Sequence, residues 1–209
     1  MIPAAFRYQR ANSVEEAVRI LAESGGTAKV LAGGHSLIPM MKLRLTRPEH
    51  LVDIGRIPGL KGIRVEGNQL VIGALTTHGE VAASETVKEK LPVLAEAASV
   101  IGDLQVRNRG TVGGNLAHAD PAADLPAAAL ALDGSLVAVG PDGTRTINLA
   151  DFFFGPFITA LATDEIVTEV RFPIPEGPWG GAYEKFAHPA SGYAVVGVAA
   201  AVEIGRAHV

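Results

Sequence analysis

The chain has 209 residues, of which 48% are hydrophobic, and its formal net charge is −4. This length and composition are sufficient for one large or two small globular domains with a buried core. The acidic balance excludes the basic stripe that nucleic-acid-binding proteins use to displace counterions. The longest apolar stretch, residues 194–202, is far shorter than the roughly 20 residues that span a bilayer, and the N-terminus lacks the pattern of a signal peptide. We therefore expect a cytoplasmic globular protein without a membrane-spanning segment or a nucleic-acid partner.

Cysteine is absent from the chain. This excludes disulfides, thiolate-held iron–sulfur clusters and a cysteine nucleophile. The six histidines show none of the spacings typical of zinc sites. We predict no metal ligand and no catalytic side chain, and we expect the chemistry to come from an organic cofactor.

The first third of the chain has the pattern of an α/β unit. Ser13 and Glu16 have capping-box spacing, and apolar residues then repeat at helical intervals as far as Gly25. A strand is predicted over residues 28–32, and a helix around residues 39–45 separates it from a strand over residues 51–54. Strands joined through a helix are most simply parallel, and ligands bind at their carboxyl ends.

The remainder of the chain has mainly antiparallel patterns. Alternating residues on both sides of Gly67 and Asn68 predict a hairpin, and Thr77 and Glu80 form a second capping box. Asp124 is placed to cap a further helix. The other predicted elements are a helix over residues 91–101, a hairpin over 136–149 and strands over 166–172, 182–186 and 193–202.

Three prolines between residues 173 and 178 predict a linker, with a domain boundary near residue 175. The two strands that follow are too few to bury a core, so we expect the second domain to be truncated. Residues 203–209 break the pattern before them. They match one reading frame of a common sequencing adapter, and we interpret them as an adapter artefact.

Two glycine pairs stand in similar surroundings, in Ala32-Gly33-Gly34-His35-Ser36 and in Thr111-Val112-Gly113-Gly114-Asn115. A glycine loop can turn sharply and direct several backbone N–H groups at one anion. Neither segment has the spacing of the nicotinamide fingerprint or of the P-loop. Together the two loops predict a clamp of another kind for the pyrophosphate of a dinucleotide.

Residues 31–45 and 110–126, which contain the two pairs, resemble the FAD-binding medium subunit of molybdenum hydroxylases, and the carbon monoxide dehydrogenase type in particular. The similarity continues to about Val202 and includes residues 51–54, 72–77 and 183–185. The resemblance implies an α+β fold, the two-lobed FAD-binding domain of the vanillyl-alcohol oxidase or PCMH type. A small parallel βαβ lobe would occupy residues 1–55 and a larger, mainly antiparallel lobe residues 56–175. Residues 176–209 would begin a C-terminal α+β domain.

The resemblance also implies a set of FAD-binding residues. Both glycine segments would enclose the pyrophosphate, Asp124 would bind a ribose or ribityl hydroxyl, Lys185 would lie near the isoalloxazine, and Tyr193 would stack on or shield that ring. The complete set is Ala32, Gly33, Gly34, His35, Ser36, Leu37, Thr111, Val112, Gly113, Gly114, Asn115, Asp124, Lys185 and Tyr193.

The implied function is electron transfer within a complex. A small subunit with two [2Fe-2S] clusters and a large molybdenum-cofactor subunit would be the partners, and FAD would pass electrons to NAD⁺, a quinone or oxygen. Any association with a membrane would come through the assembled complex. Two other interpretations stay open here: a stand-alone FAD-dependent oxidase or reductase, and a nucleotide-binding remnant without redox activity.

Overall fold

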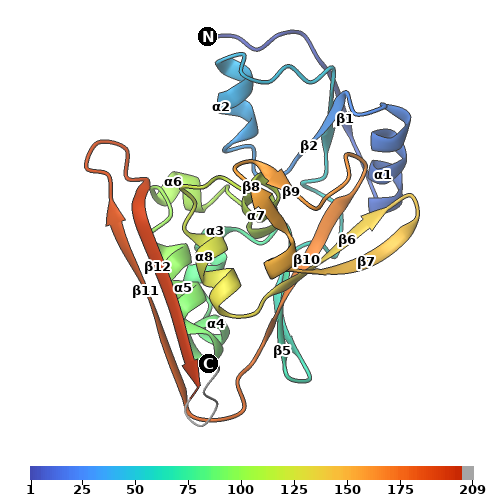
Figure 1. Ribbon diagram of the computed structural model, residues 1–209. Helices are drawn as coiled ribbons and strands as arrows, with labels where there is room; N and C mark the ends of the chain where they lie inside the picture. The colour runs from blue at the N-terminus through green and yellow to red at the C-terminus, as the bar shows by residue number, and fades with distance from the viewer. Residues whose placement is uncertain (204–209) are drawn as a thin grey trace.

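The computed structural model describes residues 1–203, and its smaller sheet lies in the N-terminal part of the chain (Figure 1). This sheet consists of β1 (Arg7–Arg10), β2 (Ala28–Leu31) and β3 (His50–Asp53), all parallel, in the order β1-β3-β2. Helix α1 (Val14–Glu23) connects β1 to β2, and α2 (Leu37–Lys42) connects β2 to β3. The predicted parallel pairing is therefore confirmed, and β1 is an additional strand.

The larger sheet is antiparallel, with the order β4-β5-β10-β6-β7. Its strands are β4 (Ile63–Glu66), β5 (Gln69–Gly73), β6 (Ser135–Gly140), β7 (Gly143–Asn148) and β10 (Ile166–Pro173). The two predicted hairpins form its outer pairs, and β10 lies between them. The mixed fold with a small parallel and a larger antiparallel sheet is the predicted fold class.

The helices α3–α8 lie on one side of this sheet, and β11 and β12 form a separate two-stranded ladder (Figure 1). The long hairpin of β11 and β12 runs beside α5 and α8. The bounds are α3 (His78–Ala83), α4 (Glu85–Lys90), α5 (Pro92–Ser99), α6 (Leu104–Arg107), α7 (Val112–His118), α8 (Leu125–Ala131), η1 (Leu149–Asp151), β8 (Phe153–Gly155), β9 (Ile158–Thr159), β11 (Trp179–Ala187) and β12 (Ala194–Glu203).

Two apolar cores hold the elements together. The larger core lies between the antiparallel sheet and its helices and includes the fully buried Leu94, Leu116 and Phe172. The smaller core packs α1 and the parallel sheet against Ile166 of β10. Because Ile166 belongs to the larger sheet, burial of apolar surface fixes the parallel sheet on it.

Several local predictions differ from the structure. The second glycine pair is not in a loop but in the first turn of α7. Asp124 occupies the N-cap position of α8 but makes no side-chain cap hydrogen bond, because both of its oxygens have other partners. Helix α2 begins at Leu37, earlier than predicted.

The expected adapter-derived tail falls almost wholly outside the described residues. Glu203 is the last residue of β12, and the rest of the tail is not part of the described chain. Within residues 1–203, none of the helices has the length and apolar character required to cross a membrane.

Candidate functional site

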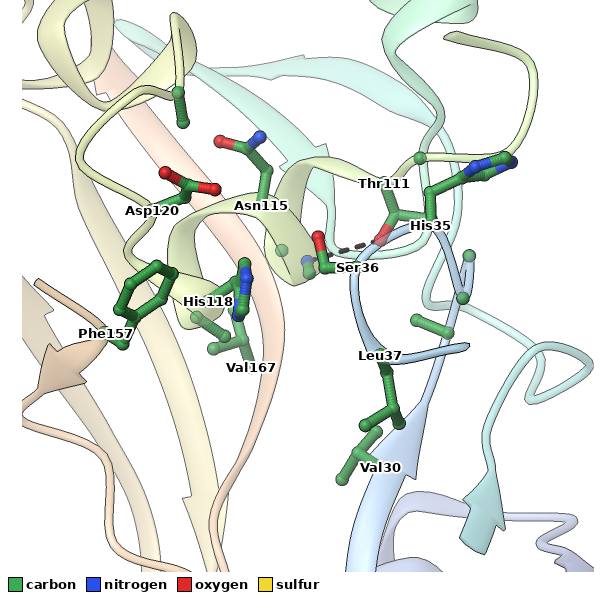
Figure 2. Close-up of a pocket in the computed structure, with 18 of the residues that line it drawn as sticks. Val30, His35, Ser36, Leu37, Thr111, Asn115, His118, Asp120, Phe157 and Val167 are labelled. Carbon is green, nitrogen blue, oxygen red and sulfur yellow. Dashed lines mark hydrogen bonds between the residues drawn. The ribbon is translucent and has the colours of Figure 1, made fainter. Parts of the chain in front are cut away.

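A cavity of about 1040 Å³ lies where the end of β2 and the start of α7 meet (Figure 2), and the tip of the β11–β12 hairpin also lines it. All but one of the predicted cofactor-binding residues line it, including Ala32, Lys185 and Tyr193. The exception is Val112, which is buried in the core. Sequence positions separated by more than 150 residues thus meet at one site.

The loop after β2 presents unused hydrogen-bond donors. Within the described part of the chain, the backbone N–H groups of residues 33–37 donate to no protein acceptor. Gly34 has a φ of +78°, a left-handed conformation that glycine adopts without strain. Successive free N–H groups at such a turn form a concave anion site.

The first turn of α7 differs, because its backbone donors are already used. The N–H groups of Val112 and Gly113 donate to the carbonyl oxygens of Thr76 and Ala74, both at 2.9 Å. That of Gly114 donates to the Thr111 hydroxyl oxygen at 3.2 Å (Figure 2), and that of Asn115 to the Thr111 carbonyl oxygen. The second glycine segment therefore cannot offer free amides to an anion without giving up these bonds.

What α7 offers is a side chain. Asn115 Oδ1 is buried and has no hydrogen-bond partner among the described residues. A buried acceptor without a partner is costly, so a bound ligand that donates a hydrogen bond here, or turns the amide so that its NH₂ group donates, would relieve it. Asn115 lies across the cavity from Ser36 of the first loop (Figure 2).

Gly33 allows the first segment to pack against the chain before α7, and Gly113 allows α7 to pack against Ala74. A Cβ atom built on Gly33 would lie 2.1 Å from the Arg109 carbonyl oxygen, and one on Gly113 would lie 2.5 Å from Ala74 Cβ. Both distances are shorter than van der Waals contact. Gly33 and Gly113 are thus required for close packing within the protein. From the sequence alone, this requirement could not be distinguished from close approach to a ligand.

Asp124 and Lys185 form a buried ion pair at the wall of the cavity. Lys185 Nζ lies 2.9 Å from Asp124 Oδ2, and the two side chains are 7% and 5% exposed. The Tyr183 hydroxyl donates to Asp124 Oδ1 at 2.7 Å, and Lys185 also donates to the Val100 carbonyl oxygen at 3.0 Å. Apart from histidines, Lys29 and Lys185 are the only cationic side chains in the lining within residues 1–203.

Two histidines of the lining, His35 and His78, lie near each other. His78, which was not predicted, is 2% exposed, and its Nδ1 has no partner in the described chain. Burial, and then the charge of nearby His35, lower the pKa of His78 from 6.5 to about 4. His78 is therefore neutral at pH 7. It follows the capping residue Thr77, so the sequence marked it only as the start of a helix.

One end of the cavity is largely apolar. Val30, Leu37 and Val167 line it, and the His118 and Phe157 rings lie there with centroids 5.0 Å apart (Figure 2). Burial lowers the pKa of His118, which keeps its imidazole neutral at pH 7. Apart from Leu37, the sequence did not identify the residues of this end, because they come from separate elements. Its apolar side chains and aromatic ring suit a heterocycle.

Tyr193 lines the opposite end, beside Ser191 and Gly192 at the tip of the hairpin, and its side chain is 58% exposed. The His188 imidazole shapes this tip, because its Nδ1 accepts from the backbone N–H groups of Ala190 and Ser191.

These features fit the parts of FAD: an anion site for the diphosphate, an apolar end and a polar end with Lys185 at its wall. In comparisons with known proteins, residues 4–175 match the family model described as "FAD binding domain in molybdopterin dehydrogenase". The chain therefore belongs to this family and binds FAD.

The relatives refine this class. The carbon monoxide dehydrogenase medium chain of Hydrogenophaga pseudoflava is 49% identical over 95% of this chain and 69% of its own length. The structure of a Cu,Mo-CO dehydrogenase matches with a TM-score of 0.94 at 42% identity, over 98% of this chain and 71% of that one. Quinoline 2-oxidoreductase from Pseudomonas putida 86 matches with a TM-score of 0.91 at 33% identity, over 98% and 70%. The chain is thus a flavoprotein subunit of an oxidoreductase of the molybdenum hydroxylase type.

Proposed function

We propose that residues 33–37 bind the diphosphate of FAD through their free backbone N–H groups. The assignment depends on the observation that these N–H groups have no acceptor within the described structure. Asn115 and the Ser36 hydroxyl would supplement them from the two sides of the cavity. Backbone dipoles can stabilise phosphate charge without a lysine or arginine next to it.

We further propose an orientation for the cofactor. The isoalloxazine would lie at the end with Lys185 and Tyr193, and the adenine at the end with Val30, Leu37 and Phe157. FAD, when bound, supplies the capacity to accept and release electrons singly or in pairs. The chain would hold and orient it, and Lys185 would place positive charge near the ring.

The proposed role is electron transfer within a larger complex. Electrons would come from the [2Fe-2S] clusters of a small subunit, after substrate oxidation on a large molybdenum-cofactor subunit, and would leave to NAD⁺, a quinone or oxygen. Relatives named as medium chains or as subunits of a complex support such partners. A cytoplasmic location stays a prediction.

Substrate choice would lie outside this chain. The relatives are named for dehydrogenases of carbon monoxide, glyceraldehyde and caffeine, yet they are 49%, 39% and 37% identical to this chain. Similar flavoprotein subunits thus occur in enzymes that are named for chemically different substrates. This indicates that another subunit recognises the substrate. The two-lobed domain of residues 1–175 and the boundary near residue 175 are part of the same proposal.

An Asn115→Asp variant tests the diphosphate site. The change keeps the shape of the side chain but puts a negative charge next to the phosphates, so we expect FAD to bind at least about tenfold more weakly. Fluorescence titration of FAD would measure this with the full chain, alone and co-expressed with its small and large subunits. Asn148→Asp adds the same charge at the exposed end of β7 and should bind FAD normally. Equal affinity of both variants and the unmodified chain would refute the assignment.

A further inference from the structure

The buried pair of Asp124 and Lys185 has a third member, Tyr183, that lies outside the cavity lining. Tyr183 is 7% exposed, belongs to the larger core and donates its hydroxyl hydrogen to Asp124 Oδ1 at 2.7 Å. Asp124 Oδ2 accepts from Lys185 at 2.9 Å. One carboxylate therefore connects a core tyrosine to the lysine at the cavity wall.

The β12 strand leaves space for this arrangement. Gly197 pairs with Lys185 across the ladder. A Cβ atom at Gly197 would lie 2.3 Å from the Tyr183 hydroxyl oxygen and 3.2 Å from the Tyr183 Cζ. Any other residue at this position would displace the hydroxyl, so glycine is required for the ring to reach Asp124.

The hydroxyl has a specific electrostatic task. Asp124 is 4% exposed, and a buried carboxylate needs hydrogen-bond donors to offset the loss of water. Lys185 supplies one donor and Tyr183 the other. Burial and the hydrogen bond to Asp124 raise the pKa of Tyr183, so the phenol stays protonated and remains a donor.

We propose that Tyr183 is the positioning residue for Lys185. Its hydroxyl fixes the orientation of Asp124, Asp124 fixes the Lys185 ammonium group at the cavity wall, and Gly197 provides the space. Tyr183 itself does not contact the cofactor. The consequence for the flavin rests on the proposed function, in which Lys185 lies near the isoalloxazine. The connection of Tyr183 to Lys185 does not rest on the proposed function.

The first test measures Lys185 without reference to FAD. In the full chain, acetylation of each lysine by acetic anhydride is followed by mass spectrometry in the unmodified protein, in Tyr183→Phe and in Gly197→Ala. Loss of one hydrogen bond to a charged group is expected to speed the acetylation of Lys185 roughly tenfold in both variants. Lys88, which is paired with Glu85 at the surface, should react at the same rate throughout.

Tyr8→Phe is the matched control, because the Tyr8 hydroxyl donates to Asp53 in the parallel sheet. This variant also loses a tyrosine–aspartate hydrogen bond but should leave Lys185 unchanged. If Tyr183→Phe and Gly197→Ala both fold, as judged by circular dichroism, and Lys185 reacts at the original rate, the inference is overturned. A faster reaction in Tyr8→Phe as well would also overturn it, since the effect would then be general loosening.

The second test measures the midpoint potential of bound FAD in the assembled complex. A cation near the ring favours the reduced, more negative flavin, so release of Lys185 should shift the potential downward in Tyr183→Phe and Gly197→Ala but not in Tyr8→Phe. Faster acetylation with an unchanged potential would support the positioning role of Tyr183 and refute the placement of the flavin beside Lys185. The two failures are therefore distinguishable.

Discussion

At the scale of single residues, Gly33 is in the tightest position of the site. Its missing side chain allows the Arg109 carbonyl group to approach, whereas the N–H groups of the same loop have no acceptor within the described chain. A substitution here acts first on the contact between the loop and the segment before α7. We expect an effect on FAD to follow from that displacement.

We expect Gly33→Ala to destabilise the fold by about 2 kcal/mol, in the range of overpacked sites, and to weaken FAD binding more than tenfold. Urea unfolding and FAD titration measure the two effects. Gly180→Ala is the control, because a Cβ atom there would meet no atom within 4 Å. Normal stability and FAD affinity of Gly33→Ala would contradict the packing role.

His78 gives a pH dependence with a defined sign. Its pKa falls from 6.5 in the unfolded chain to about 4 in the fold, so the folded state binds the proton more weakly. The stability from the neutral imidazole is complete above pH 6.5 and is lost as the pH falls toward 4. The shift corresponds to about 3 kcal/mol.

A His78→Leu variant removes this titration with a side chain of similar size. Since Nδ1 has no protein partner in the described structure, the replacement costs no hydrogen bond at this atom. Urea unfolding at several pH values should show that the unmodified chain loses more stability than the variant between pH 6.5 and 4. Parallel curves would show that His78 is not the group responsible.

At the scale of elements, α3 and α7 begin side by side. Thr77 and Thr111 cap the two helices and form an isolated antiparallel bridge. The start of α7 at the cavity thus depends on a helix that lies outside the glycine segments. Thr77 takes part in a complete capping box with Glu80.

We expect Thr77→Ala to cost about 1 kcal/mol of stability, the usual loss for an N-cap. Urea unfolding measures this value. Ser13→Ala, which removes the cap of α1, should cost a similar amount but leave FAD affinity unchanged, whereas Thr77→Ala should weaken it because α7 shifts. Equal FAD affinity in the two variants would show that α3 does not influence the FAD site.

Elements with local signals were predictable from the sequence. The cap at Ser13 and the turn at Gly67 and Asn68 lie within the elements that they define, and α1 and the β4–β5 hairpin were correctly predicted. Strand β1 has no apolar run and depends on pairing with β3, more than 40 residues away. Helix α7 was missed because two glycines disfavour a helix. The two glycine pairs suggested two similar loops. In the structure, the loop after β2 offers free backbone donors, whereas α7 offers the Asn115 side chain.

The link from Tyr183 to Asp124 spans 59 residues, and no local pattern indicates it. The residues that the family resemblance named line the cavity, except Val112, which is buried in the core. His78, the role of Tyr183 and the rest of the apolar end beyond Leu37 could be found only once the sheets were assembled.

At the scale of the whole molecule, the cavity is lined both by the parallel sheet and by helices that pack on the larger sheet. A ligand that contacts both parts binds the folded chain and not the unfolded one, and so stabilises it by mass action. We expect FAD at about 100 times its dissociation constant to add about 3 kcal/mol of stability. Thermal unfolding with increasing FAD measures this. Adenosine, which lacks the diphosphate, is the control, and an equal rise with adenosine would contradict the role of the loop after β2.

The donors of residues 33–37 belong to the main chain, and this has a consequence for mutational tolerance. Peptide groups do not titrate over the physiological range, and truncating a side chain does not delete them. Neutral drift at His35 or Leu37 can therefore alter the surroundings of the anion while its hydrogen bonds persist. Only a change in the path of the backbone would abolish them together.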